Sequence, residues 1–514
     1  MRARFAGALV VLALLVLGGV EAAWQFGLMK AGDAGAVWVD QGWGLTSRTL
    51  YGVNFGPASA DEVDLEWGRV TLRGARVDLA AAKGGHSGLE GESSGLPPVE
   101  VVVEDLELLL GDRSLGVVSG SLDERGQGTL TGDATLQIPA PMGARAKLTV
   151  EHAVEHEHVT GSVRLVGILS DPPIVRVSSD DLVVTHELLS TRPMKLPPIE
   201  GELDIVEERL AGTVRVGELP VELVVDLGGE IRGTVDQGDA ASVLAVFADI
   251  VPELRWAHVE GSISVDASWS TDGTWSLEQE IHHLGVSGAV NNLGTLRGGS
   301  LTYLVRDADG NRVPRETGDG HPEWTPLHRV SPHLIAAIIA AEDSAYYDHA
   351  GWSQESIDDA LQANIEAGSV VRGGSTLSQQ LAKNLYLDGE RTLERKLREL
   401  VIAVELDRAL GKRRVLELYV NVVEWGPGMW GVAAAADRYF LRQPEALPPN
   451  EAAFLAALLP DPRGYYTDWY LRDRASSVRI DWILENMANG GHLSSAEAEK
   501  WAREPLRFVP PPKD

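Results

Sequence analysis

The second half of the sequence contains a carboxylate placed where it could act as a base. Glu342 follows a run of apolar residues, four positions after Ile338 and three after Ile339, so helical spacing puts its side chain on the apolar face of a predicted helix. A carboxylate on such a face is costly unless it is paired or lines a cleft, and burial raises its pKa toward that of a general base working near neutral pH. These residues alone leave a structural Glu–Arg pair as the alternative.

A second stretch could bind an anion. Arg372–Leu387 reads RGGSTLSQQLAKNLYL, in which adjacent glycines ending at Gly374 allow a close backbone approach and Ser375 is predicted as the N-cap of a helix. The free N–H groups and the dipole of a helix start attract anions. The polar face that begins there carries a cation and consists of Thr376, Gln380 and Lys383. A buried polar helix start with no ligand is the alternative at this point.

Composition limits the ligands of these candidate sites. The chain has 514 residues, enough for two to four domains, and a net charge of −30, which argues against nucleic acid as a partner. Within this acidic chain, Arg372–Arg414 has ten Lys or Arg against six Asp or Glu, so an anionic ligand is expected there. The absence of cysteine excludes disulfides, thiolate metal sites and cysteine nucleophiles.

The N-terminal residues 1–24 are predicted to anchor the chain. Phe5–Trp24 contains Glu21 as its one charged residue, and twenty helical residues rise about 30 Å, enough to cross a bilayer core. Arg2 and Arg4 precede this segment, which predicts a cytoplasmic N-terminus. A cleaved signal peptide, with small residues near Ala22, is the alternative. Both interpretations export the remainder of the chain.

Residues 37–306 are predicted to form an antiparallel β-rich domain. Short β-branched runs such as Val99–Val103 alternate with a recurring Gly-polar-apolar pattern, which indicates a meander of strands. Asp239–Val251 is the one predicted helix, and the Gly- and Ser-rich segment Ala82–Pro98 is predicted as a loop. The region resembles periplasmic β-groove proteins of the AsmA type, which follow a membrane anchor and are implicated in lipid handling.

Three histidines of this region could share one strand face. They are His152, His156 and His158. No acidic residue on that face is identified as a partner, so no metal site is assigned, here or elsewhere in the chain.

A mainly helical domain is predicted at 327–514, after a linker at 307–326 that is rich in Gly, Pro and charge. Ser331-Pro332 opens its first helix, and Tyr346 and His349 are expected on the next turns of the Glu342 face. Three later helices are predicted at Ala452–Leu459, Ala475–Met487 and Ser495–Ala502.

Five motifs in this domain resemble those of the family 51 glycosyltransferases, the peptidoglycan polymerases. The family's ED-x-x-F-x-x-H-x-G corresponds to Glu342–Gly351 with Tyr346 for Phe, and GGST-[IL]-[TS]-QQLAKNL corresponds to Gly373–Leu385. R-K-x-x-E, K-x-x-[IV]-LE-x-Y-[LV]-N and the last motif follow in order at Arg395–Glu399, Lys412–Asn421 and Asn421–Phe440. The last motif looks most like the monofunctional members. One departure is Leu441, where the family usually has Gly.

The resemblance implies a multidomain protein whose C-terminal glycosyltransferase domain is lysozyme-like. It implies polymerisation of lipid II into β-1,4 glycan strands with inversion and release of undecaprenyl pyrophosphate. Glu342 is implied as the general base, and Glu399 as a second catalytic carboxylate that either holds Arg395 in place or contacts the donor. The residues implied for substrate or pyrophosphate binding are Gly374, Ser375, Thr376, Gln379, Gln380, Lys383, Asn384, Arg395 and Lys396. Those implied to support the motifs are Asp343, His349, Glu417, Tyr419 and Asn421.

The implied partners are lipid II, the growing glycan chain, the cytoplasmic membrane and other cell-wall synthesis proteins. No cofactor is required, although Mg or Mn could assist. The family's donor site also binds moenomycin, a phosphoglycolipid that mimics the donor.

Two other functions stay open on the sequence. The chain could be a degenerate polymerase that acts as an envelope lipid-binding or scaffold protein. Its retention of the motif residues argues against this function; they are Glu342, Lys383, Arg395 and Glu399. It could also cleave glycan as lysozyme does, since such enzymes use carboxylates too. The basic segment argues against cleavage, which expels no pyrophosphate. No lysine has a serine three residues before it, so a Ser-x-x-Lys transpeptidase site is excluded.

Overall fold

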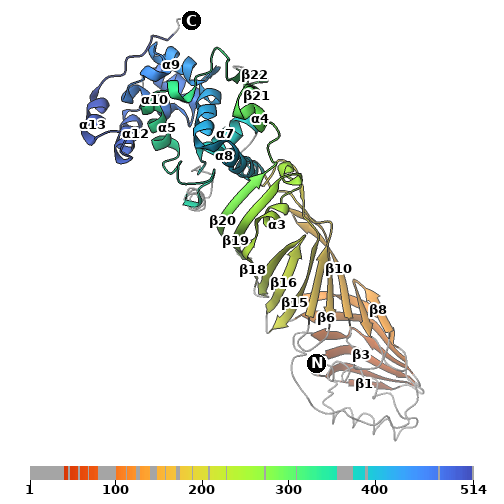
Figure 1. Ribbon diagram of the computed structural model, residues 1–514. Coiled ribbons are helices and arrows are strands. Elements are labelled where there is room, and N and C mark those ends of the chain that lie inside the picture. The colour runs from red at the N-terminus through yellow and green to blue at the C-terminus, as the bar shows by residue number, and fades with distance from the viewer. Residues whose placement is uncertain are drawn as a thin grey trace. The chain divides into compact units, whose positions relative to one another are not determined.

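The computed structural model describes residues 40–511 with gaps, the longest at 79–99, 139–146 and 356–373 (Figure 1). The described chain forms two units. Of the described residues, the first unit comprises those up to Val184, those in Lys195–Asp236 and those in Val265–Gln279. The second comprises those in Thr185–Met194, those in Gln237–Ser264 and those from Glu280 onward. The predicted anchor Phe5–Trp24 lies outside the described residues. Among the residues that are described, no helix combines the length and the apolar character that a membrane crossing requires.

The first unit is built from consecutive, mostly antiparallel strands, as the meander predicted. They are β1 (Asp40–Trp43), β2 (Ser47–Phe55), β3 (Ala58–Glu66), β4 (Arg69–Arg73), β5 (Arg76–Asp78), β6 (Glu100–Leu110), β7 (Arg113–Leu122), β8 (Gly128–Gly132), β9 (Ala134–Ile138), β10 (Lys147–His156), β11 (Val159–Ile168), β12 (Ile174–Ser179), β13 (Val183–Val184), β14 (Met194–Lys195), β15 (Ile199–Val206), β16 (Arg209–Val216), β17 (Leu219–Asp226) and β18 (Glu230–Asp239). Met194 of β14 and Gln237–Asp239 of β18 belong to the second unit.

One part of this sheet differs from a simple meander. β4 and β5 both pair with β6 in parallel, with Arg69 opposite Glu100 and Arg76 opposite Glu107. Parallel neighbours need a crossover of a dozen or more residues, and residues 79–99 between β5 and β6 provide that length. The predicted loop Ala82–Pro98 falls within this segment, outside the described residues. Local strand patterns could not reveal this pairing, because the period of two is the same in parallel and antiparallel strands.

The recurring glycines lie mostly inside the strands. At Gly212 of β16, an added Cβ would lie 2.2 Å from the carbonyl oxygen of Glu202 on the neighbouring strand, so a larger residue would force the two strands apart. The pattern therefore marks close strand approach and not only turns.

The second unit begins with β-rich segments and contains the end of the predicted β domain. Its first elements are α3 (Ala240–Ala245), the 3₁₀ helix η1 (Pro252–Arg255), parts of β19 (His258–Ser270) and β20 (Trp275–Ser287), α4 (Leu293–Arg297), β21 (Ser300–Arg306) and β22 (Arg312–Gly318). The predicted helix Asp239–Val251 is shorter than expected: Asp239 caps α3, and turns follow after Ala245.

The predicted linker 307–326 is wrong in part, because it contains β22. This strand pairs with β21 from Ser300 opposite Gly318 to Arg306 opposite Arg312. Alternate residues of β21, including Tyr303, are buried in the core of the helical region. The boundary predicted between 306 and 307 therefore cuts a hairpin that belongs to the second unit. The polar, Gly- and Pro-containing composition of the hairpin and its turn produced this error.

The helices form the remainder of the second unit (Figure 1). They are α5 (Pro332–Glu342), α7 (Leu377–Tyr386), α8 (Leu393–Val422), α9 (Val432–Phe440), α10 (Pro449–Leu458), α11 (Pro462–Tyr465), a π-helical turn (Tyr466–Leu471), α12 (Ser477–Asn489) and α13 (Ser495–Arg503), with the short 3₁₀ helices Leu327–Arg329 and Pro444–Ala446 and the strands β23 (Glu424–Gly426) and β24 (Met429–Trp430). The three predicted C-terminal helices are confirmed to within a few residues. One hydrophobic core joins α5, α7, α8, α9, α10 and α12.

Candidate active site

Glu342 is the last residue of α5, and its side chain is 11% exposed. Burial raises the pKa of its carboxyl group above the ordinary value, while the hydrogen bond from Gln380 and the charges of Arg479 and Lys383 act against that shift. The two contacts hold opposite oxygens: Gln380 Nε2 donates to Oε2 at 2.9 Å, and an Arg479 nitrogen lies 3.6 Å from Oε1. This is a desolvated carboxylate with the character of a general base.

Gln380 links Glu342 to a buried tyrosine. The hydroxyl of Tyr419, on α8, donates to Gln380 Oε1 at 2.9 Å, while the amide nitrogen of Gln380 donates to Glu342. Tyr419 is fully buried, and the loss of solvation raises the pKa of its phenol well above the usual value. It therefore stays protonated as a donor, and this orients the Gln380 amide so that its nitrogen faces Glu342.

Asp343 and His349 fasten the segment after α5. Asp343 is the C-cap of α5, and its carboxylate accepts from the Leu377 backbone N–H at 2.9 Å and contacts His349 Nε2 at 2.9 Å. His349 Nδ1 faces the Gly351 N–H and the Lys412 ammonium. Because α5 ends at Glu342, Tyr346 and His349 lie in turns and not on a continued helix, which corrects that expectation. The network ties Glu342 to the first turn of α7.

The start of α7 is capped one residue later than predicted. Thr376, and not Ser375, is the N-cap, and it forms a reciprocal capping box with Gln379. Both side chains are buried, so they serve the helix start. Ser375 Oγ instead accepts a hydrogen bond from the Lys396 ammonium, which brings Ser375 next to the RKxxE motif.

Glu399 lies beneath two cations. Its side chain is 2% exposed, with Oε2 2.6 Å from Lys396 Nζ and Oε1 3.4 Å from Arg395 Nε. A buried carboxylate that contacts both groups holds them in place and removes their mutual repulsion. The geometry therefore makes Glu399 a positioning residue for Arg395 and Lys396. The alternative weighed on the sequence was direct contact with the donor.

Lys383 and Arg395 line a pocket of about 210 Å³ together with Asn384, whose Nδ2 donates to the Gln380 carbonyl at 2.8 Å. The Lys383 side chain keeps contact with solvent through the open side of the pocket. Many protein atoms still lie near its ammonium group, and this partial desolvation lowers its pKa. Glu399 acts against that shift, while Arg395 and Lys396 add to it. The described lining of this pocket does not include Gly374, Ser375 or Lys396. The cations Lys383 and Arg395 suit a group on which negative charge develops.

The remaining motif residues support the backbone. Glu417 accepts from the Leu327 N–H at 3.0 Å, and Asn421 accepts from the Thr325 N–H at 2.8 Å and donates to its carbonyl at 2.9 Å. These contacts fasten the segment before α5 onto α8.

Sequence reasoning missed Arg479 on α12 and the two arginines with which the β21–β22 hairpin lines the pocket, Arg306 and Arg312. Arg479 reaches Glu342 from beyond the last motif, and no sequence pattern around it indicates a site. Within the described residues, no group of three or more His, Asp or Glu side chains could hold a metal ion. His152 and His156 fall among residues whose side chains are not described.

The region of the chain that contains the five motifs is similar to known proteins. The family described as Transglycosylase matches residues 309–488. A biosynthetic peptidoglycan transglycosylase of Aromatoleum aromaticum is 48% identical over 181 residues, which cover 35% of this chain and 79% of that protein. The one from Alcanivorax borkumensis is 46% identical and is covered to 74%, with 34% of this chain. The one from Thiobacillus denitrificans is 44% identical, and the match covers 65% of that protein and 30% of this chain.

A crystal structure of penicillin-binding protein 1A from Haemophilus influenzae is 21% identical, covering 41% of this chain and 21% of that chain with a TM-score of 0.22, a likeness too low to support an argument. The relatives from Aromatoleum aromaticum and Alcanivorax borkumensis are each matched over more than two thirds of their length, at well over 30% identity. The catalytic-site motifs, their geometry and these relatives agree: the chain belongs to the biosynthetic peptidoglycan transglycosylase family.

Proposed function

We propose that the second unit polymerises lipid II into β-1,4 glycan strands. The observation that carries this proposal is the desolvated Glu342 carboxylate on the same structural unit as the cations Lys383, Arg395 and Lys396. One group removes a proton, and the others receive a polyanionic leaving group. Glycan hydrolysis would need the carboxylate but not the cations.

In the proposed reaction, Glu342 takes the proton of the acceptor sugar's 4-hydroxyl while that oxygen bonds to the anomeric carbon of the donor. The bond from this carbon to the pyrophosphate oxygen breaks on the opposite face, so the configuration inverts. Lys383 and Arg395 stabilise the negative charge that grows on the leaving pyrophosphate, and buried Glu399 keeps Arg395 in place. Gln380, aligned by Tyr419, orients the base.

We also propose that Phe5–Trp24 anchors the chain in the bacterial inner membrane with its N-terminus in the cytoplasm. This topology would place both units in the periplasm, where the anchored lipid substrate presents its sugars. The β-rich first unit would then act as an envelope module of the lipid-handling type. Other cell-wall synthesis proteins are proposed partners.

The reaction as proposed needs no resident cofactor, since the protein's own cations face the leaving group. If a divalent cation takes part, Mg or Mn would enter the site together with the pyrophosphate. Polymer yield with excess EDTA would measure that contribution.

The test is incubation of the detergent-solubilised full chain with labelled lipid II, followed by gel separation of the glycan products. The proposal predicts long strands that a muramidase cleaves. If the protein instead shortens preformed glycan and leaves lipid II unchanged, it is a hydrolase. If it binds lipid II without conversion, it is a binding protein.

A further inference from the structure

The first turn of α8 is held by a segment from a distant part of the chain. This segment is Thr185–Met194, which belongs to the second unit although the residues on either side of it belong to the first. Ser190 is 5% exposed, and its hydroxyl donates to Glu394 Oε2 at 2.5 Å. The carbonyl of Leu189 accepts from the Glu394 backbone N–H at 2.9 Å. Glu394 is therefore held through both its side chain and its backbone.

The backbone contact satisfies a group that an isolated helix leaves unpaired. Glu394 is the second residue of α8, so its N–H has no partner inside the helix. The N-cap, Thr392, accepts from Arg395 instead. The Leu189 carbonyl accepts the N–H that this cap does not reach. The start of α8 is thus completed from outside the helix.

The segment has the shape that these contacts require. The N–H groups of Leu189 and Ser190 both donate to the His186 carbonyl, at 2.9 and 3.1 Å, which closes a tight turn. The Ser190 oxygen accepts from the Arg192 N–H at 3.2 Å, so its own hydrogen is available for the contact with α8. Arg192 donates in turn to the Asp249 carbonyl at 2.7 Å. The turn therefore presents a hydroxyl and a carbonyl to α8 in one fixed arrangement.

The turn of α8 that is held in this way carries two cations of the site. Arg395 and Lys396 directly follow Glu394, and both contact buried Glu399 one turn later. Glu399 fixes the two side chains relative to the helix, whereas the contacts at Glu394 fix the part of the helix that carries them. A shift of this turn would move both cations together, and a misplacement of about 1 Å can cost roughly a hundredfold in rate.

We propose that Ser190, together with the Leu189 carbonyl, is a positioning residue of the transferase: it holds the first turn of α8 where Arg395 and Lys396 meet the leaving group. The inference rests on the proposed function, which gives these cations their role. Ser190 and Leu189 lie outside residues 309–488, which match the family, so the five motifs do not contain this support. A segment of the region predicted as a β-rich domain thereby serves catalysis without touching the substrate.

Steady-state kinetics of the full chain with labelled lipid II in detergent test the proposal. Ser190→Ala should lower kcat by roughly tenfold and leave KM nearly unchanged, because the displaced cations act on charge that develops in the transition state. Ser190→Thr keeps a hydroxyl and should restore most of this loss. Ser300→Ala is the matched control, since Ser300 donates to Glu316 at the same 2.5 Å between β21 and β22, and it should leave kcat unchanged. An effect of Ser190→Ala on KM alone, or a kcat equal to that of the control, would overturn the inference.

The partner side of the hydrogen bond provides a second pair of variants, which serves if Ser190→Ala does not fold. Glu394 is half-buried, and Glu394→Gln keeps an oxygen that can accept from Ser190, so it should retain most of the turnover. Glu394→Leu has a similar size without an acceptor and should reproduce the loss of kcat. The double variant Ser190→Ala/Glu394→Leu should be no worse than the poorer single variant, since both changes break one hydrogen bond. Equal losses for glutamine and leucine, or additive losses in the double variant, would contradict the positioning role.

Hydrogen exchange separates this inference from the proposed function, because it needs no turnover. In Ser190→Ala the backbone amides in the first turn of α8 should exchange faster, while the rest of the second unit keeps its protection. Unchanged exchange in this turn would overturn the inference, even if the protein polymerises lipid II. Faster exchange with wild-type turnover would overturn the positioning role. Faster exchange in a protein whose wild type makes no polymer would support the hold on α8 and contradict the proposed function.

Discussion

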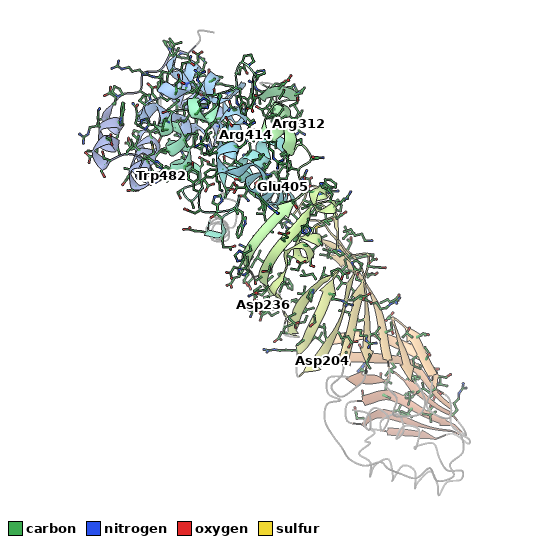
Figure 2. The ribbon with its side chains drawn as sticks, viewed as in Figure 1. Asp204, Asp236, Arg312, Glu405, Arg414 and Trp482 are labelled. Carbon is green, nitrogen blue, oxygen red and sulfur yellow. The ribbon has the colours of Figure 1, made fainter. Side chains whose placement is uncertain are left out.

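The guanidinium of Arg398 on α8 grips both carboxylate oxygens of Glu253 on η1, with Nε 3.0 and 3.1 Å from the oxygens and a terminal nitrogen 2.7 Å from Oε1. Arg398 immediately precedes Glu399, which holds the cations of the site. An ion pair therefore joins η1, which lies in the region predicted as a β domain, to α8, the helix that carries the RKxxE motif. A second buried carboxylate on this helix, Glu405, is labelled in Figure 2.

Removing the Glu253 carboxylate should destabilise the second unit and lower its turnover. Glu253→Ala leaves Arg398 without its partner, and because Arg398 is 27% exposed we expect a loss near the low end for buried pairs, about 3 kcal/mol. Denaturant unfolding measures this loss. Arg503→Ala breaks the exposed Arg503–Glu499 pair and should cost less than about 1 kcal/mol. Equal losses in the two variants would contradict the anchoring role.

A fragment that starts at Asp307 should not fold as a stable enzyme. It loses β21, and buried Glu405 loses the Gly288 and Val290 N–H groups that donate to it at 2.8 and 2.7 Å. A buried charge stripped of its partners is strongly destabilising. Circular dichroism should show no cooperative melting transition. A fragment that melts cooperatively and polymerises lipid II at the full-length rate would place the catalytic domain boundary back at 307.

Lys383→Ala should impair catalysis and leave the fold intact. Lys383 is exposed, so its removal should change stability by less than about 1 kcal/mol, whereas loss of a charge that meets the leaving group should lower turnover by roughly a hundredfold. The same variant should bind moenomycin more weakly. Because the pKa of Lys383 is lowered, wild-type turnover should fall at high pH before the ordinary lysine range is reached. Normal turnover together with a lower melting temperature would make Lys383 a structural residue.

Gln380→Leu should lower turnover through the orientation of Glu342. Leucine has a similar volume but neither donates to Glu342 nor accepts from Tyr419, so the base loses its fixed rotamer and its pKa rises further. The acidic limb of the pH–rate profile should therefore move to higher pH. Gln380→Glu puts a second carboxyl group beside Glu342, and like-charge repulsion should move the acidic limb in the same direction. A change in KM with an unmoved pH profile would instead indicate direct substrate contact.

The sequence predicted which motif residues lie near one another better than it predicted the contacts that hold them. Glu342 and Gln380, which are hydrogen-bonded, could be singled out because helical spacing and motif order are local properties. The cap at Thr376 was missed by one residue because Ser375 and Thr376 are both good caps. The Thr-x-x-Gln spacing of the capping box with Gln379 was the local signal that could have identified it. Arg479 and Arg306 could not be found, because tertiary packing alone brings them to the site.

Glu342→Gln tests the central claim most directly. The wild-type carboxyl group has a raised pKa in the folded protein, so its ionisation lowers the stability of the fold. That cost is absent below the unfolded pKa, grows as the pH rises from the unfolded to the folded pKa, and is complete above the folded pKa. The glutamine variant avoids this cost and should remain folded at neutral pH. Its amide cannot take the proton from the 4-hydroxyl of the acceptor sugar. Polymer formation from labelled lipid II should fall by about 10²–10⁴ relative to wild type. Polymerisation by the folded variant at the wild-type rate would contradict the assignment of Glu342 as the base.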